Sequence, residues 1–220
     1  LEALPQAGSG GHVVVVGGGP AGLAAALLAQ QAGFDTELLE ARATLGGGLV
    51  ASAAPPHKDK LQWYQRYLER QLAASEVTVK AATRAEAGPL ADAHPRLVVL
   101  ACGGQANRLP IEGIGLPLVL DAYELLMGDA EPALPAPATG LPMLVYGGGE
   151  TGCETSEYLA ERGHRVVLVS RSPARQLARA AEPIYRGVLL QRLRANTLVS
   201  VREQTQLTRI TAEGLVHLQH

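Results

Sequence analysis

Two copies of one glycine pattern constrain the fold of this chain more than any other feature of its sequence. Gly17-x-Gly19-x-x-Gly22 recurs as Gly147-x-Gly149-x-x-Gly152, at an offset of 130 residues (147 − 17). The same offset relates two further pairs, Gly33 with Gly163 and Glu40 with Ser170. The sequence therefore predicts one structural unit that occurs twice.

Hydrophobic patterning around the glycines predicts strands that alternate with helices. In the first copy we expect a strand at 12–16, a helix at 22–32 that ends at Gly33, and a strand at 36–40. The second copy predicts a strand at 143–146, a helix at 153–162 that ends at Gly163, and a strand at 165–169. Further elements are expected at 59–74 (helix), 77–80 and 96–101 (strands), and 182–194 (helix). This alternation is typical of an α/β fold with parallel sheets.

The glycine spacing has a physical reason when it follows a strand and opens a helix. The first glycine permits the tight turn, the second lets a pyrophosphate approach the backbone, and the third lets helix and strand pack closely. The helix N-terminus then offers free N–H groups and the positive end of its dipole to the phosphates. Each copy therefore predicts a dinucleotide site, at Gly17, Gly19 and Gly22, and at Gly147, Gly149 and Gly152.

The two predicted sites differ at the end of the strand that follows. Glu40 stands 23 residues after Gly17 (40 − 17), close to the spacing of about 20 for a carboxylate that binds the adenosine ribose. Ser170 takes this place in the second copy, and Arg171 follows it. A hydroxyl and a guanidinium can bind a 2′-phosphate that a carboxylate would repel. Two such sites predict FAD together with NADH or NADPH, and Ser170 with Arg171 favours NADPH.

Composition excludes several other classes of protein. The net charge of −2 gives no indication of a nucleic acid or an anionic membrane as partner. No apolar run approaches the roughly 20 residues that span a bilayer, and no signal peptide is visible. The two cysteines form neither a disulfide framework nor a metal cluster, so we expect a reducing, cytoplasmic setting.

Three longer segments resemble one known family. Glu40 through Gly47 is similar to the FAD-type signature in which an acid precedes a Gly-Gly pair, and 98–103 with 109–113 is similar to the crossover of flavoproteins with two dinucleotide domains. The stretch 46–58 with the helix through Tyr64 and Tyr67 narrows the resemblance. It is similar to the C-terminal half of the trimethylamine dehydrogenase and 2,4-dienoyl-CoA reductase family of NADH:flavin oxidoreductases, over residues 12–215.

The resemblance implies a flavin-dependent NAD(P)H oxidoreductase module. Hydride would pass between the nicotinamide nucleotide and FAD, and electrons would go on to a partner domain. The residues implied to hold FAD or ADP are Gly17, Gly19, Pro20, Ala21, Gly22, Glu40, Arg42, Gly46, Gly47, Cys102 and Gly103. Those implied to hold the nicotinamide nucleotide are Gly147, Gly149, Glu150, Thr151 and Gly152, with Ser170 and Arg171. No catalytic side chain and no metal ligand is expected, because the cofactors carry the chemistry.

Departures from the family pattern leave alternatives open. Complete members carry an N-terminal barrel with FMN and a cysteine cluster for a 4Fe-4S centre, and two cysteines cannot ligate that cluster. Members also return to the first domain after the second one, whereas this chain stops at His220, so we expect a fragment with an incomplete first domain. It could instead be a non-catalytic ADP-binding module that braces a larger FMN/4Fe-4S oxidoreductase, or a subunit whose barrel is a separate chain.

The expected organisation is two Rossmann-like dinucleotide-binding domains. A linker covers 1–11, the FAD- or ADP-binding domain 12–115, a proline-rich connection 116–141, and the NAD(P)-binding domain 142–220. Within them, Cys102 in an apolar strand is expected to be a buried, inert thiol, and His164 to face solvent. Cys153 is expected in the first turn of a helix, whose dipole would lower its pKa, although a packed structural thiol is the favoured interpretation.

Overall fold

The computed structural model describes residues 10–129, 134–137 and 140–220. Most of the expected linker and parts of the proline-rich connection lie outside these ranges. Contacts divide the chain into two compact units, one formed by 1–53 and 58–105 and the other by 54–57 and 106–220. In the described ranges, no helix is both long and apolar enough to cross a membrane.

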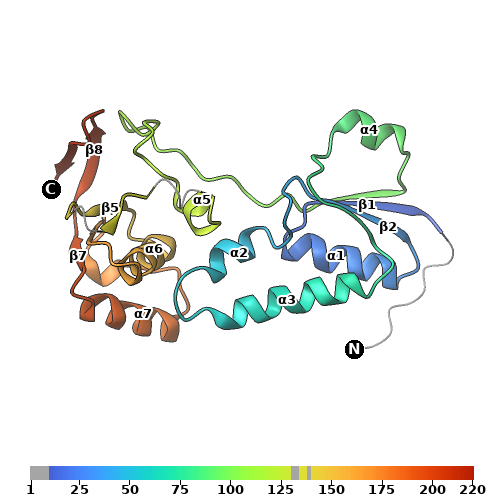
Figure 1. Ribbon diagram of the computed structural model, residues 1–220, viewed down its shortest axis with the longest axis horizontal. Coiled ribbons are helices and arrows are strands. Elements are labelled where there is room, and N and C mark those ends of the chain that lie inside the picture. Colours follow the sequence, from blue (N-terminus) through green and yellow to red (C-terminus); the bar gives the residue numbers. More distant parts are fainter. Residues whose placement is uncertain (1–9, 130–133, 138–139) are drawn as a thin grey trace. The chain divides into compact units, whose positions relative to one another are not determined.

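The first unit is built on a four-stranded parallel sheet (Figure 1). Its strands, in the order β3-β2-β1-β4, are β1 (His12–Val16), β2 (Asp35–Leu39), β3 (Thr78–Lys80) and β4 (Leu97–Leu100). Val15 pairs with Leu38 on one side and with Val99 on the other. Strand β1 is therefore central, and the residues that follow it lie at the carboxyl edge of the sheet.

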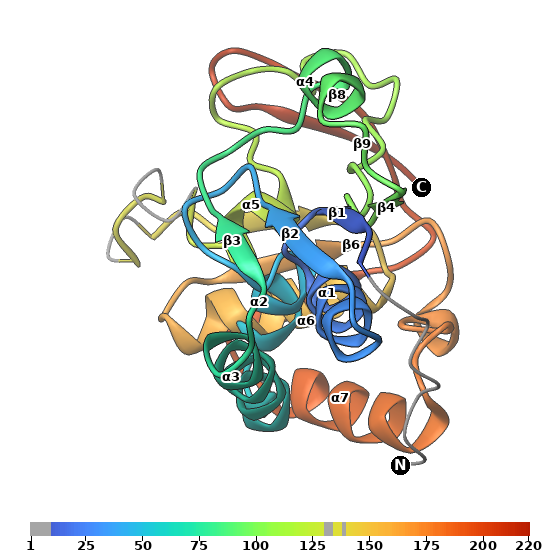
Figure 2. The same ribbon diagram turned by 90° about the vertical axis from the view of Figure 1, so that its right-hand side faces the viewer.

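Two long helices pack on one face of this sheet. Figure 2 shows α1 (Pro20–Gln31) and α3 (Asp59–Ala73) on the same side of β1 and β2. The shared core contains Val13, Val15, Leu23, Ala26, Leu38, Leu68, Leu72 and Val77, all nearly inaccessible to solvent. Two short helices complete the unit. Helix α2 (Gly48–Ala53) packs against α3, and α4 (Ala87–Asp92) follows β3 and precedes β4 along the chain.

The second unit repeats this plan on a smaller sheet. Its parallel strands, in the order β5-β6-β7, are β5 (Met143–Tyr146), β6 (Val166–Val169) and β7 (Val199–Arg202). Helix α6 (Glu150–Glu161) packs on this sheet, and both α5 (Ala122–Leu126) and α7 (Pro183–Ala195) pack against α6. A short turn of helix, η3 (Ala174–Gln176), follows β6. An antiparallel hairpin of β8 (Gln206–Ile210) and β9 (Val216–Gln219) completes the unit.

The predicted α/β architecture with parallel sheets is confirmed, with shifts at the helix starts. Helices α1 and α6 begin at Pro20 and Glu150, before the predicted Gly22 and Cys153. The third glycine of each pattern thus lies inside the first helical turn. Strand β8 was not predicted, because 206–210 mixes polar and apolar residues without a clear period.

Candidate dinucleotide-binding sites

The first glycine turn joins β1 to α1 under tight steric limits. Gly17 has φ +110, and a Cβ placed on it would lie 2.3 Å from the carbonyl oxygen of Ala101. A Cβ on Gly22 would lie 1.8 Å from the carbonyl oxygen of Gly17. Neither position accepts a side chain unless the backbone moves. These glycines therefore hold the start of α1 directly against the end of β1.

The second turn has the same construction between β5 and α6. Gly147 has φ +128, and a Cβ on Gly152 would lie 1.8 Å from the carbonyl oxygen of Gly147. The Gly147 N–H donates to Val169 O at 2.9 Å, as the Gly17 N–H donates to Leu39 O at 2.8 Å. The repeat in the sequence is thus a repeat in local geometry.

The middle glycine of each pattern leaves room for a ligand. A Cβ on Gly19 would have its nearest neighbour at 3.9 Å, and one on Gly149 would have none within 4 Å. Gly19 and Gly149 are also the N-caps of α1 and α6, and neither helix has a side-chain cap. The first-turn N–H groups are therefore available to an anion. Both turns fit a pyrophosphate by this test.

The predicted residues at each helix start lie where the pattern requires. Pro20 is at the start of α1, where its missing N–H costs no hydrogen bond, and Ala21 is exposed beside it. In the second copy Glu150 and Thr151 open α6. Glu150 adds a carboxylate to this first turn, where the helix dipole favours a negative charge.

Glu40 follows β2 and braces the first turn. Its side chain is 8% exposed. One carboxylate oxygen accepts the Gly18 N–H at 2.6 Å, and the other accepts the Arg42 N–H at 2.7 Å. Because a carboxylate has about four acceptor sites, these two bonds leave capacity for ribose hydroxyls.

Ser170 takes this place after β6 and is almost fully buried, at 1% exposed. Its hydroxyl oxygen accepts the Ser172 N–H at 3.1 Å. Arg171 is exposed next to it and helps to line a hollow of about 210 Å³. The other side chains around the hollow are Gln204, Gln206, Gln219 and His220, none of which carries a carboxylate. These side chains come from β8, β9 and the segments next to them, which the sequence pattern did not mark as part of a site.

The segment after Glu40 returns to the glycine turn. The Gly46 N–H donates to Gly18 O at 2.8 Å. A Cβ on Gly47 would lie 2.9 Å from the Cα of Gly19, and both Gly46 and Gly47 have positive φ. The structure therefore brings the predicted Gly46–Gly47 pair directly to the predicted Gly17–Gly22 turn.

Cys102 and Gly103 follow β4 at the same edge of the sheet. The Cys102 thiol approaches Val16 O, with 3.7 Å between sulfur and oxygen, and the residue is exposed. The expectation of a buried thiol was wrong, because β4 ends at Leu100 and Cys102 lies beyond its pairing partners. Gly103, with φ +69, is exposed as well.

Cys153 is a packed structural thiol, as the favoured interpretation had it. Burial raises its pKa to about 11 and outweighs the opposing effects of a backbone hydrogen bond from Ala178 and of the Arg186 charge. The predicted lowering by the helix dipole was wrong, since desolvation disfavours the thiolate more strongly here. His164 is also buried, at 5% exposed, contrary to the expectation that it faces solvent.

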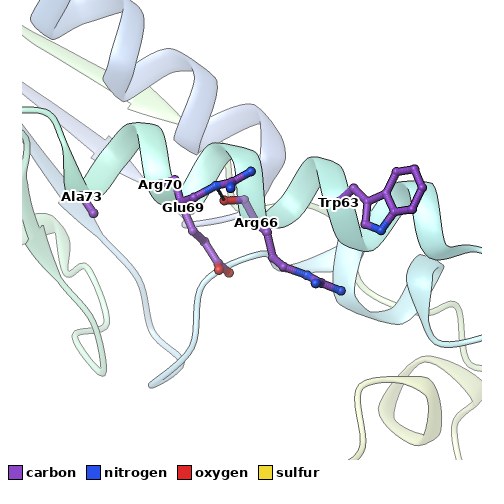
Figure 3. A pocket seen from close by; sticks show the side chains of 5 residues that line it. All are labelled: Trp63, Arg66, Glu69, Arg70 and Ala73. Carbon is purple, nitrogen blue, oxygen red and sulfur yellow. Dashed lines mark hydrogen bonds between the residues drawn. The ribbon is translucent and has the colours of Figure 1, made fainter.

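A larger hollow, about 430 Å³, lies along α3 (Figure 3), and no predicted site residue is among the side chains that line it. It is lined by Trp63, Arg66, Glu69, Arg70 and Ala73. Tyr64 on the same helix is 46% exposed and stacks on Tyr67. Among the described residues, no group of three His, Cys, Asp or Glu side chains could hold a metal ion.

Comparison with known proteins adds a family match. A family model described as pyridine nucleotide-disulphide oxidoreductase matches residues 11–220. NADH oxidase of Thermoanaerobacter brockii is 34% identical over 211 residues, which cover 92% of this chain and 30% of the relative. Bilirubin reductase of Mediterraneibacter gnavus is 32% identical over 203 residues, again 92% of this chain and 30% of the relative. The chain thus spans about a third of the length of these curated relatives.

Solved structures agree in fold. A 2-naphthoyl-CoA reductase structure superposes with a TM-score of 0.85 at 26% identity, over 98% of this chain and 31% of that one. Histamine dehydrogenase from Rhizobium sp. 4-9 gives 0.77 at 23% identity, over 99% and 36%. FprA from Mycobacterium tuberculosis in complex with NADPH gives 0.68 at 16% identity, over 94% and 62%. The last two likenesses show the fold.

Proposed function

The chain belongs to the pyridine nucleotide-disulphide oxidoreductase family, and we propose that it works as a flavin-dependent NAD(P)H oxidoreductase module. Residues 147–152 would hold a nicotinamide nucleotide and residues 17–22 would hold FAD. The two cofactors would supply hydride transfer, with the electrons passed to a partner domain. One observation carries this proposal. The two glycine turns share a backbone hydrogen bond to the neighbouring strand and the close packing at the third glycine, but Glu40 follows one and Ser170 with Arg171 follows the other.

The first turn is the proposed FAD site. Gly17, Gly19 and Gly22, with Pro20 and Ala21, hold the pyrophosphate, and Glu40 accepts the ribose hydroxyls. Arg42, Gly46, Gly47, Cys102 and Gly103 line the rest of the cofactor. Gly46 and Gly47 suit this role because their backbone lies against Gly18 and Gly19 with no side chain between. The bound flavin supplies the hydride-accepting chemistry, and these residues supply binding and orientation.

The second turn is the proposed nicotinamide nucleotide site, formed by Gly147, Gly149, Glu150, Thr151 and Gly152. Ser170 and Arg171 favour NADPH over NADH, because a guanidinium forms strong charge-assisted bonds with a 2′-phosphate. The hollow beside Arg171 supports this preference, since neutral amides and a histidine line it with no opposing carboxylate side chain. The NADH oxidase among the relatives makes NADH the other outcome of the test.

A dithiol of this chain is not part of the proposed reaction. The chain has two cysteines, both free, and the raised pKa of Cys153 keeps it in the unreactive thiol form at neutral pH. The family name refers to disulfides, but this chain provides no reactive pair. We propose that the electrons leave the flavin for a group outside this chain.

We propose that this outside group belongs to a longer parent protein or a partner subunit. The chain spans about 30% of the relatives NADH oxidase and bilirubin reductase. An FMN barrel with a 4Fe-4S centre is the proposed acceptor, in line with the resemblance seen in the sequence. The two free cysteines are consistent with a reducing, cytoplasmic setting.

The visible spectrum of the purified protein tests the proposal. We expect flavin absorption that bleaches under anaerobic conditions when NADPH is added. A colourless protein that releases ADP on denaturation would overturn the proposal in favour of a non-catalytic ADP-binding module. A flavin that NADPH and NADH both fail to bleach, in the presence of the partner domain, would also contradict it.

A further inference from the structure

In both glycine turns the residue after the first glycine accepts a backbone hydrogen bond from a later loop, which the sequence repeat does not reveal. We call this hydrogen bond the brace. In the first unit Gly46 N–H donates to Gly18 O, and in the second Ala178 N–H donates to Gly148 O, both at 2.8 Å. A leucine precedes each donor. A Cβ on Gly18 would lie 2.7 Å from the Leu45 side chain, and one on Gly148 would lie 2.6 Å from Leu177. The donor-to-acceptor spacing is 28 residues in one copy (46 − 18) and 30 in the other (178 − 148). The acceptors therefore follow the 130-residue offset of the repeat, and the donors do not.

The two braces differ in how their backbone is accommodated. Gly46 has φ +106, and Ala178 has φ +49. Glycine adopts positive φ freely, whereas the Cβ of alanine makes the left-handed region unfavourable. Ala178 is completely buried and still holds this conformation. Other contacts must therefore keep the second brace in place.

Arg186 on α7 provides those contacts. Its Nε donates to Leu177 O at 2.8 Å, and one terminal nitrogen donates to Arg175 O at 2.5 Å. The rigid, planar guanidinium fixes two carbonyl groups of the same loop at once. From the other side, the Glu203 carboxylate accepts the Ala174 N–H at 2.5 Å. The loop between Arg171 and Ala178 is thus fastened at both ends of η3.

Helix α7 is itself fixed to the helix that carries the second turn. Arg192 forms a two-point ion pair with Glu157 of α6, and its second contact measures 3.0 Å. The Tyr185 hydroxyl donates to Glu154 of α6 at 2.5 Å. Arg186 therefore projects from a helix that is anchored to α6, whose N-terminus is formed by the Gly147–Gly152 turn.

We propose that Arg186 is a positioning residue for the nicotinamide nucleotide. It holds Leu177 and Ala178 against Gly148, which keeps the second turn open for the pyrophosphate and keeps Arg171 next to the ribose end of the site. It acts through the loop and does not touch the nucleotide. The inference rests on the proposed function, because it requires a nucleotide at 147–152.

The test compares Arg186→Gln with Arg186→Lys in the full chain, loaded with its flavin. Arg194→Gln is the matched control, because Arg194 lies on the same helix and is exposed. The measurements are KM and kcat for NADPH-dependent flavin reduction, together with the Tm. We expect Arg186→Gln to raise KM about tenfold, the scale of one lost charge-assisted hydrogen bond. The value of kcat should not change, Lys should recover part of the loss, and the control should match wild type.

A second variant separates positioning from general stability. Ala178→Gly removes the cost of positive φ, so the hydrogen bond to Gly148 should form without the support of Arg186. Added to Arg186→Gln, it should return KM close to the wild-type value. If Arg186→Gln lowers the Tm but leaves KM unchanged, or if Ala178→Gly fails to restore KM, the proposal is overturned. A wild-type protein that binds neither NADPH nor NADH would instead overturn the proposed function.

Discussion

The carboxylate of Glu40 accepts the backbone N–H of Gly18 at 2.6 Å, inside the turn that Glu40 is also proposed to serve as ribose ligand. The same carboxylate accepts the Arg42 N–H at 2.7 Å. One buried side chain thus connects the end of β2, the glycine turn and the segment that leads to Gly46. The architecture of the site and its ligand chemistry depend on the same residue.

Replacing Glu40 by Gln should weaken both the structure of the glycine turn and the binding of the flavin. The amide keeps one acceptor oxygen but places an NH₂ group against one of the two backbone donors. We expect a loss of about 1–3 kcal/mol in the free energy of unfolding, the cost of an unsatisfied buried donor, together with reduced flavin content. Urea unfolding and the absorbance ratio of flavin to protein measure the two effects. Glu76→Gln, an exposed carboxylate before β3, should change neither, and equal effects of both variants would contradict this role.

Alanine at the third glycine of each pattern should separate the two sites. A Cβ on Gly22 or Gly152 would lie 1.8 Å from the oxygen of Gly17 or Gly147, so helix and turn must move apart. We expect Gly22→Ala to lose flavin, and Gly152→Ala to keep its flavin but lose nicotinamide nucleotide binding by calorimetry. Gly187→Ala is the control: it lies in α7 with nothing within 4 Å of its Cβ, and it should stabilise the helix by about 0.5–1 kcal/mol. Loss of both ligands from either single variant would contradict two independent sites.

Reversing the charge at Arg171 should change the choice between nucleotides. A carboxylate beside Ser170 would repel a 2′-phosphate, whereas NADH has none to repel. We expect Arg171→Glu to raise the KM for NADPH by about tenfold to a hundredfold, the range of a lost charge-assisted contact, with little change for NADH. Arg165→Glu, an exposed residue just before β6, is the control. Equal changes for NADPH and NADH would rule out Arg171 as the selecting residue.

The two cysteines should differ sharply in reactivity. Cys102 is exposed, and burial raises the pKa of Cys153 to about 11. A thiol-reactive dye at pH 8 should label the native protein once, and Cys102→Ser should abolish that labelling while Cys153→Ser does not. Two equivalents of label on the native protein would contradict the packing of Cys153.

The raised pKa of Cys153 also predicts how the stability of the protein changes with pH. The folded protein holds the Cys153 proton more tightly than the unfolded chain, so the contribution of this group to stability is complete below the ordinary thiol pKa. It decreases as the pH rises from that value through about 11. Cys153→Ala should remove this part of the alkaline loss of stability, as followed by urea midpoints from pH 8 to pH 10.5.

Local patterns were enough to predict the repeated unit. Glycines that need positive φ or a missing side chain, as at Gly17 and Gly22, can be recognised from spacing alone, because the requirement arises within a few residues of the turn. The β-branched run at 13–16 predicted the central strand for a similar reason. Cys102 was misjudged because its exposure depends on where β4 ends, and that is set by pairing with β1.

The sequence by itself determined the two strand–turn–helix units, their parallel sheets and the difference between Glu40 and Ser170. Only the tertiary structure decided what holds each turn. Ala178, 30 residues further along the chain, donates a hydrogen bond to Gly148. Arg186 on α7 supports that contact through its hydrogen bond to Leu177. Such contacts depend on how the chain folds back after β6. The hydrophobic pattern of the sequence does not predict the path of this segment. Backbone requirements are local and leave a pattern in the sequence, whereas the contacts that support them come from the packing of distant elements.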